Sequence, residues 1–304
     1  MIVTTPEERF AGLPDFPFAP HRFVFDGVGI HYLDEGAGPP VVMFHGEPTW
    51  SFLYRHIIPP LVAAGFRAIA PDYPGFGKSD KPTDEGYYTY DRLVDGMLAL
   101  VDHLELDDAT AVVQDWGGPI GLAVAVRRPE RFRRLSILNT GLFSGGGASP
   151  NPAFDAWRAF VAANPDLPIG MIMANAAGRP WDPAVFGAYE APFPTQQHKV
   201  GAWRLPLIVP RQPEDPGAAE MLAVRDALAH WTGPAQVLFS DGDPIFSVRA
   251  GQRLVDLIPG AAELEVVAGA GHFLQEDAGE QVAERLISFL RRDDEGDDGA
   301  GKGA

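Results

Sequence analysis

One short segment, VVQDWGGPIG from Val112 to Gly121, has the residue types of a tight turn that presents a nucleophile. Apolar residues typical of a buried strand lead into Asp115, glycines follow at 117 and 118, and the chain then becomes apolar and helical in pattern. Such a strand–turn–helix unit exposes its central side chain at the edge of a sheet. Serine is the usual central residue, and an aspartate in its place would form an ester that water can cleave. The alternative role for Asp115 is a helix N-cap.

A second segment, FHGEPTW from Phe44 to Trp50, follows another predicted strand with the pattern His-Gly-x-Pro. This arrangement offers a backbone N–H group to a negatively charged oxygen. We expect an oxyanion hole formed by the N–H groups of Glu47 and Trp116, the second being the residue directly after the nucleophile. Each such donor contributes about 3 to 4 kcal/mol in related chemistry.

Two later segments supply an acid and a histidine. LFSDGDPIF places Asp241 and Asp243 just past a predicted strand, and GAGHFLQED places His272 after the last strand. The order nucleophile, acid, histidine is that of a triad on an open α/β sheet. Asp243 is the better partner for His272 because the chain turns after it towards the next helix, whereas Asp241 is placed to cap the turn. A calcium site is the alternative, but Ca²⁺ takes about six to eight oxygen ligands and only two carboxylates are local.

The elements that must position these residues alternate between strands and helices. Apolar segments predict strands at 21–25, 30–34, 40–45, 67–72, 109–115, 133–139, 235–241 and 264–269. Helical patterns occupy 52–64, 91–104, 118–127, 248–257 and 279–290. This alternation indicates an α/β fold with a mostly parallel eight-stranded sheet flanked by helices.

The alternation stops between about Leu142 and Gly233. About ninety residues are too many for a structureless connection in a compact domain. We therefore predict a discontinuous core of residues 1–142 and 233–290, with an inserted helical cap of residues 143–232. The cap is expected to lie over the strand ends, where open α/β sheets bind ligands, and to enclose a cavity there. Residues 291–304, charged and rich in glycine, are expected to be a disordered acidic tail.

Composition limits the functional classes. The 304 residues are 46% hydrophobic, which is enough for a large core. The absence of cysteine indicates a reducing compartment, so we expect a cytoplasmic protein. A formal charge of −17 opposes binding to nucleic acid or anionic lipid, and no apolar run approaches the ~18 residues that span a bilayer. No motif for a metal or another cofactor is present, so none is expected.

Together, the segments HGEPTWSFLYR, DYPGFGKSDKP, VVQDWGG, DGDPIF and AGHFLQED resemble the haloalkane dehalogenases of the α/β-hydrolase superfamily. They are most similar to the subgroup with an Asp-His-Asp triad and two halide-binding tryptophans. The resemblance runs from about Pro6 to Phe289 and includes FDAWRAF and AYEAPFP in the predicted cap.

The resemblance implies a role for each residue of the site. Asp115 would be the nucleophile, His272 the base and Asp243 its acid partner, with Trp116 and Trp157 as halide ligands. Indole N–H groups suit this role because they donate and cannot accept a hydrogen bond. From their place in the predicted cap, three phenylalanines are expected to line the pocket: Phe154, Phe160 and Phe193.

The activity implied is hydrolysis of small haloalkanes to a primary alcohol, a halide and a proton through a covalent alkyl-aspartate ester. The expected partners are therefore the haloalkane, the halide ion and water. Neither nucleic acid nor a membrane is expected to bind, and the oligomeric state is left open, a monomer being one option.

Two other functions remain to be weighed. An epoxide hydrolase shares the aspartate nucleophile and the triad, but it needs acids at the ring oxygen, normally a pair of cap tyrosines, and only Tyr189 lies in the predicted cap. A non-catalytic ligand-binding protein of the same fold would have lost its triad, whereas every triad position here holds a competent residue.

Overall fold

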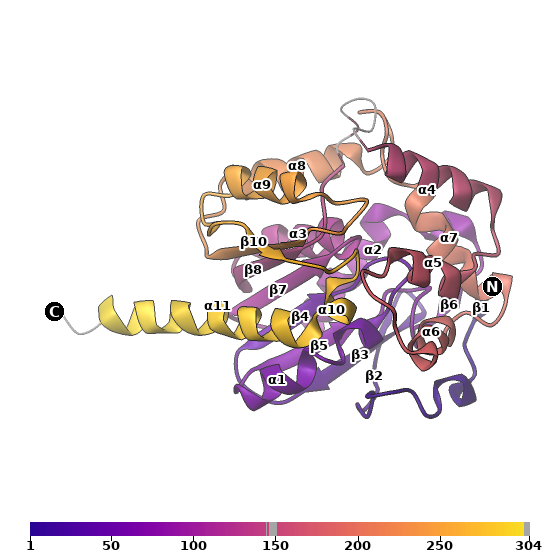
Figure 1. Ribbon diagram of the computed structural model, residues 1–304, viewed down its shortest axis with the longest axis horizontal. Coiled ribbons are helices and arrows are strands. Elements are labelled where there is room, and N and C mark those ends of the chain that lie inside the picture. Colours follow the sequence, from indigo (N-terminus) through magenta and orange to yellow (C-terminus); the bar gives the residue numbers. More distant parts are fainter. Residues whose placement is uncertain (144, 146–150, 301–304) are drawn as a thin grey trace.

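The apolar segments of the chain form one central sheet (Figure 1). The structure is a computed structural model and describes residues 1–143, 145 and 151–300. Its strands lie in the order β10-β9-β8-β7-β4-β5-β3-β2. Their bounds are β2 (His21–Phe25), β3 (Val28–Glu35), β4 (Pro40–Phe44), β5 (Arg67–Pro71), β7 (Ala109–Gln114), β8 (Phe132–Leu138), β9 (Ala235–Ser240) and β10 (Glu265–Val267). Of these eight strands, β3 alone runs opposite to the other seven, so the predicted mostly parallel eight-stranded sheet is confirmed.

Helices flank the sheet on both faces. The central strands β4, β7 and β9 are therefore buried along their whole length. Helix α1 (Ile58–Ala63) packs with α11 (Gly279–Ala300), whereas α2 (Tyr90–His103) packs with α3 (Gly117–Arg127). Figure 1 shows these two pairs on opposite sides of the sheet. Helix α3 is buried from Gly117 to Ala125, which explains why its sequence is apolar all round. The remaining core helices are α9 (Val248–Leu257) and the short α10 (Leu274–Asp277).

The long insertion between β8 and β9 is helical, as expected. Its helices are α4 (Pro152–Ala163), α5 (Ile169–Ala176), α6 (Pro183–Glu190), α7 (Val200–Leu207) and α8 (Ala218–Leu228). Helix α4 packs with α7 and α5 with α6, but α8 packs against α3 of the core. The boundaries 143 and 232 stay a prediction, and the packing of α8 favours an earlier end of the cap. The first residues of the predicted cap, 144 and 146–150, lie outside the described residues.

Several short elements follow from no sequence pattern. Strands β1 (Ile2–Val3) and β6 (Lys81–Pro82) pair as a separate antiparallel two-stranded sheet, and two residues are too few to show a period. The other short elements are the 3₁₀ helices η1 (Glu7–Phe10), η2 (Ser51–Tyr54), η3 (Glu85–Tyr87) and η4 (Gln196–Lys199).

The carboxyl-terminal helix differs from its prediction. Helix α11 extends through residues 291–300, where we expected disorder, and residues 301–304 lie outside the described residues. The first part of the helix has an apolar face, on which Val282, Leu286 and Leu290 are buried. The chain then continues as an α-helix to Ala300.

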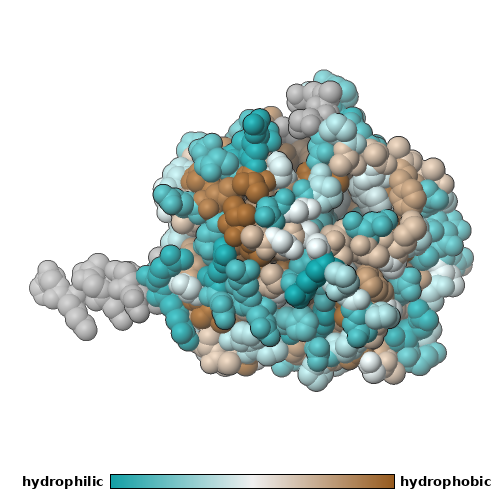
Figure 2. Space-filling model, in the orientation of Figure 1, coloured by the Kyte–Doolittle hydropathy of each residue, from teal (hydrophilic) through white to brown (hydrophobic). Residues whose placement is uncertain are grey.

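Hydrophilic residues cover most of the face shown in Figure 2, with a hydrophobic group over the region of α9 and β10. Within the described part of the chain, no helix combines the length and apolar character needed to cross a membrane.

Candidate active site

The turn between β7 and α3 holds Asp115 in a backbone conformation that side chains rarely adopt. Its φ is +50°, in the left-handed region. The turn is tight enough that a Cβ at Gly117 would collide with the carbonyl oxygen of Phe44 on the neighbouring strand. Thr140 Oγ1 donates a 2.6 Å hydrogen bond to the Asp115 carbonyl and closes the turn from the other side. Strain of this kind is retained where it presents a functional side chain.

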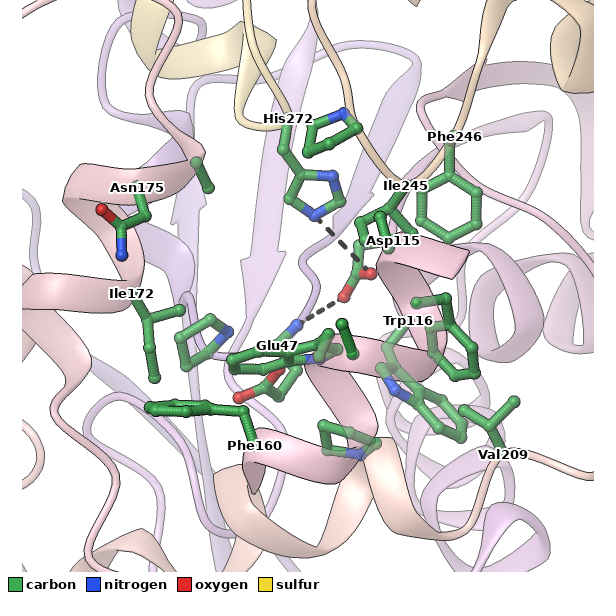
Figure 3. Close-up of a pocket in the computed structure, with 18 of the residues that line it drawn as sticks. Glu47, Asp115, Trp116, Phe160, Ile172, Asn175, Val209, Ile245, Phe246 and His272 are labelled. Atoms are coloured by element: carbon green, nitrogen blue, oxygen red, sulfur yellow. Dashed lines mark hydrogen bonds and ion pairs between the residues drawn. The ribbon is translucent and has the colours of Figure 1, made fainter. Parts of the chain in front are cut away.

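The Asp115 carboxylate lies between two sets of partners (Figure 3). Its Oδ1 accepts a 2.7 Å hydrogen bond from the backbone N–H of Glu47, and the N–H of Trp116 also donates to the carboxylate. Its Oδ2 lies 3.7 Å from His272 Nε2. Helix α3 has Trp116 at its N-cap, with no side-chain cap, so Asp115 does not take the alternative role of N-cap. Burial raises the pKa of Asp115 despite the opposing effects of His272 and the two N–H groups.

His272 is paired with Asp243 and not with Asp241. His272 Nδ1 donates to Asp243 Oδ2 over 2.9 Å, and Asp243 Oδ1 accepts the backbone N–H groups of residues 245 and 246. Asp241 is exposed and accepts a 2.7 Å hydrogen bond from the N–H of Gly269, as expected for a turn cap. Burial lowers the pKa of His272, but the charges of Asp243 and Asp115 outweigh it and raise this pKa to about 9. The free site therefore holds an imidazolium between two carboxylates at neutral pH.

Two buried amide side chains that sequence reasoning missed hold the His272 loop. Gln114 Nε2 lies 3.3 Å from His272 Nε2 and donates to the His272 carbonyl over the same distance. Asn139 Nδ2 donates to the same carbonyl over 3.1 Å. Both amides lie at the carboxyl ends of apolar strands. A polar residue in that position is the sequence feature that could have identified them as part of the site. Since both are fully buried, they orient the histidine without contacting solvent.

A further anchor joins the His272 loop to the inserted helices. Asp277 of α10 accepts the N–H of Gly271 with Oδ2 (2.7 Å) and the N–H of Gly178 with the same oxygen (2.8 Å). Its Oδ1 accepts the indole N–H of Trp181 over 2.7 Å. Gly178 and Trp181 follow α5, so one buried carboxylate ties the insertion to the histidine loop.

The candidate site opens into a cavity of about 490 Å³. Asp115, Trp116, Glu47 and His272 lie on its wall, and most of the remaining wall is apolar, as the labelled side chains of Figure 3 illustrate. That wall comes from α4, α5, α7 and the segments that follow β8, α7 and β9. It includes Phe143, Phe154, Phe160, Ile172, Val209, Ile245 and Phe246. Such a cavity suits a small apolar molecule whose reactive end faces the polar groups.

Two tryptophans line this cavity, Trp116 of the turn and Trp157 of α4. Trp157 is half-buried and stacks on Phe160, with ring centroids 5.9 Å apart. Neither indole N–H has a hydrogen-bond acceptor among the described residues. Three other tryptophans donate theirs to protein oxygens: Trp50 to Ala188, Trp181 to Asp277 and Trp203 to Val161. Two donors are thus available to a ligand in the cavity.

The pocket prediction is wrong for one phenylalanine. Phe154 and Phe160 line the cavity, but Phe193 does not. It lies beyond the end of α6 and packs edge to face on Phe76, with centroids 6.3 Å apart, because the chain there turns back onto the loop after β5.

No tyrosine lines the cavity in the described part of the chain. The cap tyrosine, Tyr189, is fully buried, and its hydroxyl donates to Glu276 Oε2 over 2.7 Å. Arg55 holds the same carboxylate through both of its terminal nitrogens. Tyr189 is therefore part of a buried ion-pair cluster and cannot reach a ring oxygen in the pocket.

Comparison with known proteins shows which enzymes the chain is similar to. A family model described as alpha/beta hydrolase fold matches residues 39–279. The haloalkane dehalogenase of Mycobacterium marinum is 44% identical over 95% of this chain and 99% of its own length, and that of Psychrobacter cryohalolentis is 42% identical over 95% and 98%. The tetrameric structure of haloalkane dehalogenase DpaA from Paraglaciecola agarilytica NO2 matches with a TM-score of 0.87 and 34% identity, covering 94% of this chain and 97% of that one.

Proposed function

Because the chain belongs to the haloalkane dehalogenases within the α/β-hydrolase fold, we propose that it cleaves carbon–halogen bonds in two steps through an alkyl ester of Asp115. The observation that carries this assignment is a carboxylate, in place of a hydroxyl, at the strained turn facing an apolar cavity. A serine that attacked a saturated carbon would leave an ether that the enzyme could not hydrolyse. An aspartate leaves an ester, whose carbonyl water can attack.

In the first step, Asp115 Oδ2 attacks the carbon from the side opposite the halogen, and the halide leaves with the electron pair of the broken bond. Oδ1 stays on the N–H group of Glu47 and becomes the carbonyl oxygen of the ester. The unpaired indoles of Trp116 and Trp157 would hold the departing halide. Hydrogen bonds to charged groups contribute about 1.5 to 3 kcal/mol each, so two that strengthen as charge develops would accelerate this step ~100-fold or more.

In the second step, His272 activates water against the ester. Ester formation removes the negative charge of Asp115, which is one of the charges that raise the pKa of His272. The imidazolium then loses its proton to solvent more easily and becomes a base. Water attacks the ester carbonyl as His272 takes its proton, and the oxyanion forms on Oδ1 between the two backbone N–H groups. Collapse breaks the bond to the alkyl oxygen, which takes up the proton of the newly added hydroxyl group and leaves as the alcohol, so that Asp115 is again a carboxylate and His272 an imidazolium. The sum is an alcohol, a halide and a proton.

The cavity supports small haloalkanes as substrates. Its wall offers apolar contact, and among the described residues it has no ionisable group besides Glu47, Asp115 and His272. Epoxide hydrolysis lacks support, because no described tyrosine lines this wall to donate a proton to a ring oxygen.

Release of bromide from 1,2-dibromoethane tests the proposal directly. We expect equal amounts of bromide and acid from the wild type and none above background from Asp115→Asn, since the amide is not a nucleophile. Turnover of styrene oxide without halide release would instead support an epoxide hydrolase. If neither compound is turned over, a non-catalytic protein would be supported.

The proposed reaction uses the haloalkane and water as substrates and releases the halide ion. A cytoplasmic location is proposed on the cysteine-free sequence. A monomer is the simplest assembly for a site that one chain completes, although one solved relative is described as tetrameric. Gel filtration with light scattering would establish which assembly this chain forms.

A further inference from the structure

We propose that the Glu47 side chain is a neutral carboxylic acid that donates a hydrogen bond to the halide, as a third ligand beside Trp116 and Trp157. The proposal rests on the proposed function, because it assigns a further ligand to the same halide site. It concerns the side chain alone, which is distinct from the backbone N–H group of the same residue that holds Asp115.

The Glu47 carboxyl group is buried in the cavity wall without a protein partner. The residue is 5% exposed and lines the cavity. Its Oε1 is fully buried, and neither carboxyl oxygen has a hydrogen-bond partner among the described residues. Oε1 has no accessible surface, so Oε2, which also lacks a partner but is not fully buried, is the oxygen that a ligand in the cavity can reach. A poorly solvated polar atom without a partner costs about 1 to 3 kcal/mol, and an O–H group on Oε2 that donates to a ligand would remove this cost.

The side chain points towards the proposed halide site. In Figure 3 it extends away from His272, to the part of the cavity bordered by Phe160. Phe160 stacks on Trp157, so the carboxyl group lies on the same side of the pocket as that indole. Backside attack by Asp115 drives the halogen away from the Asp115–His272 pair, and the Glu47 side chain also extends away from His272.

The distribution of partners decides which carboxyl group carries the proton. Asp115 has two backbone N–H donors and the imidazolium of His272, whereas Glu47 has no donor among the described residues. Two carboxylates in one apolar cavity cannot both ionise cheaply, so the negative charge belongs to Asp115 and the proton to Glu47. Burial and the charge of Asp115 accordingly raise the pKa of Glu47 well above its usual range.

A neutral acid and a carboxylate act on a halide in opposite ways. The acid donates its O–H, whereas the carboxylate repels the ion. Halide affinity should thus be highest when Glu47 is protonated and should fall as the pH rises through its pKa. The other titratable groups that act on this site are Asp115, His272, Asp243 and the buried hydroxyl of Tyr73, so the effect of Glu47 must be separated from theirs.

Three proteins separate these effects: the wild type, Glu47→Gln and Glu47→Leu. Glutamine keeps an N–H donor of similar reach but cannot ionise, and leucine has no donor yet suits an apolar wall. The bromide dissociation constant is measured by tryptophan fluorescence quenching from pH 6 to pH 10. Titration of the other groups is common to all three proteins, so the ratio of wild type to Glu47→Gln isolates the carboxyl group.

At pH 6 we expect Glu47→Gln to bind bromide within about threefold of the wild type, and Glu47→Leu to bind about tenfold more weakly or worse, as for a lost hydrogen bond to an ion. As the pH rises, the wild type should lose affinity faster than Glu47→Gln. Equal affinity of the wild type and Glu47→Leu at pH 6 would overturn this proposal alone. Fluorescence that bromide does not quench in any of the three proteins would overturn the halide site as well.

Discussion

In the proposed mechanism, Asp115 and His272 divide the two chemical steps between them. A carboxylate displaces a halide without help from a base, whereas water attacks an ester at a useful rate only when a base takes its proton. The 3.7 Å between His272 Nε2 and Asp115 Oδ2 leaves the carboxylate oxygen free to attack, and it places the imidazole beside the ester that forms. In a variant without the base, the reaction should therefore stop at the alkyl ester of Asp115.

We predict that His272→Ala accumulates an alkyl ester on Asp115. Incubation with 1,2-dibromoethane should release about one bromide per enzyme molecule in a burst and then stop. Mass spectrometry of the peptide that contains Asp115 should show the bromoethyl adduct. An unmodified peptide alongside the burst would contradict the covalent scheme, and Asp115→Asn is the control that should show neither burst nor adduct.

A second prediction concerns the tryptophan of α4. Trp157→Phe removes one unpaired indole N–H from the cavity and should weaken bromide binding about tenfold or more. Trp203→Phe is the matched control, since Trp203 is also a half-buried tryptophan of the insertion but donates to the Val161 carbonyl. Fluorescence titration with bromide compares the two variants, and equal affinities would mean that Trp157 is an ordinary packing residue.

At the scale of elements, the histidine loop depends on helices from two parts of the chain. Asp277 of α10 accepts three hydrogen bonds, one from the loop itself and two from the segment that follows α5. The residue is buried, so no water replaces these partners. The loop is therefore positioned by the insertion as well as by the core.

Asp277→Ala should destabilise the protein and misplace the base. Three donors would lose their acceptor, the buried N–H of Gly271 and the partly buried N–H groups of Gly178 and Trp181, which should lower the free energy of unfolding by about 2 kcal/mol or more. Hydrolysis of the ester should slow more than its formation, so rapid-quench experiments should show the ester accumulating. Asp241→Ala is the control, because Asp241 accepts one N–H on an exposed turn, and equal effects of both variants would contradict the anchoring role.

At the scale of the whole molecule, the charges around His272 couple stability to pH. The pKa of His272 is about 9 in the folded protein against an ordinary value near 6.5, so the folded state binds this proton more tightly than the unfolded state. The stabilisation is present in full below about pH 6.5 and is lost as the pH rises through 9. A shift of this size corresponds to on the order of 3 kcal/mol.

We therefore predict that the wild type loses this stabilisation between pH 6.5 and pH 9.5 and that His272→Ala does not. Free energies of unfolding from urea titrations at several pH values measure the effect. The difference between the two proteins should shrink as the pH rises, after allowing for a constant packing cost of the alanine. Parallel profiles would show that the histidine carries no raised pKa.

The sequence alone determined the sheet, the turn and the types of the reacting groups. Strands buried on both faces must be apolar along their length, so β4, β7 and β9 are evident in the chain. The turn at Asp115 tolerates only small residues behind its centre, which makes its sequence specific. These features are local, and a local pattern records them completely.

Only the tertiary structure decided which side chains meet. Phe160 faces the cavity and Phe193 does not, although both lie in the same apolar insertion. Gln114 reaches a histidine 158 residues away in sequence, and the Glu47 carboxyl group is left without a partner. The periodicity of apolar residues predicts that a side chain is buried, but it does not identify the residues that the side chain contacts. Those contacts depend on how segments distant in the sequence pack together.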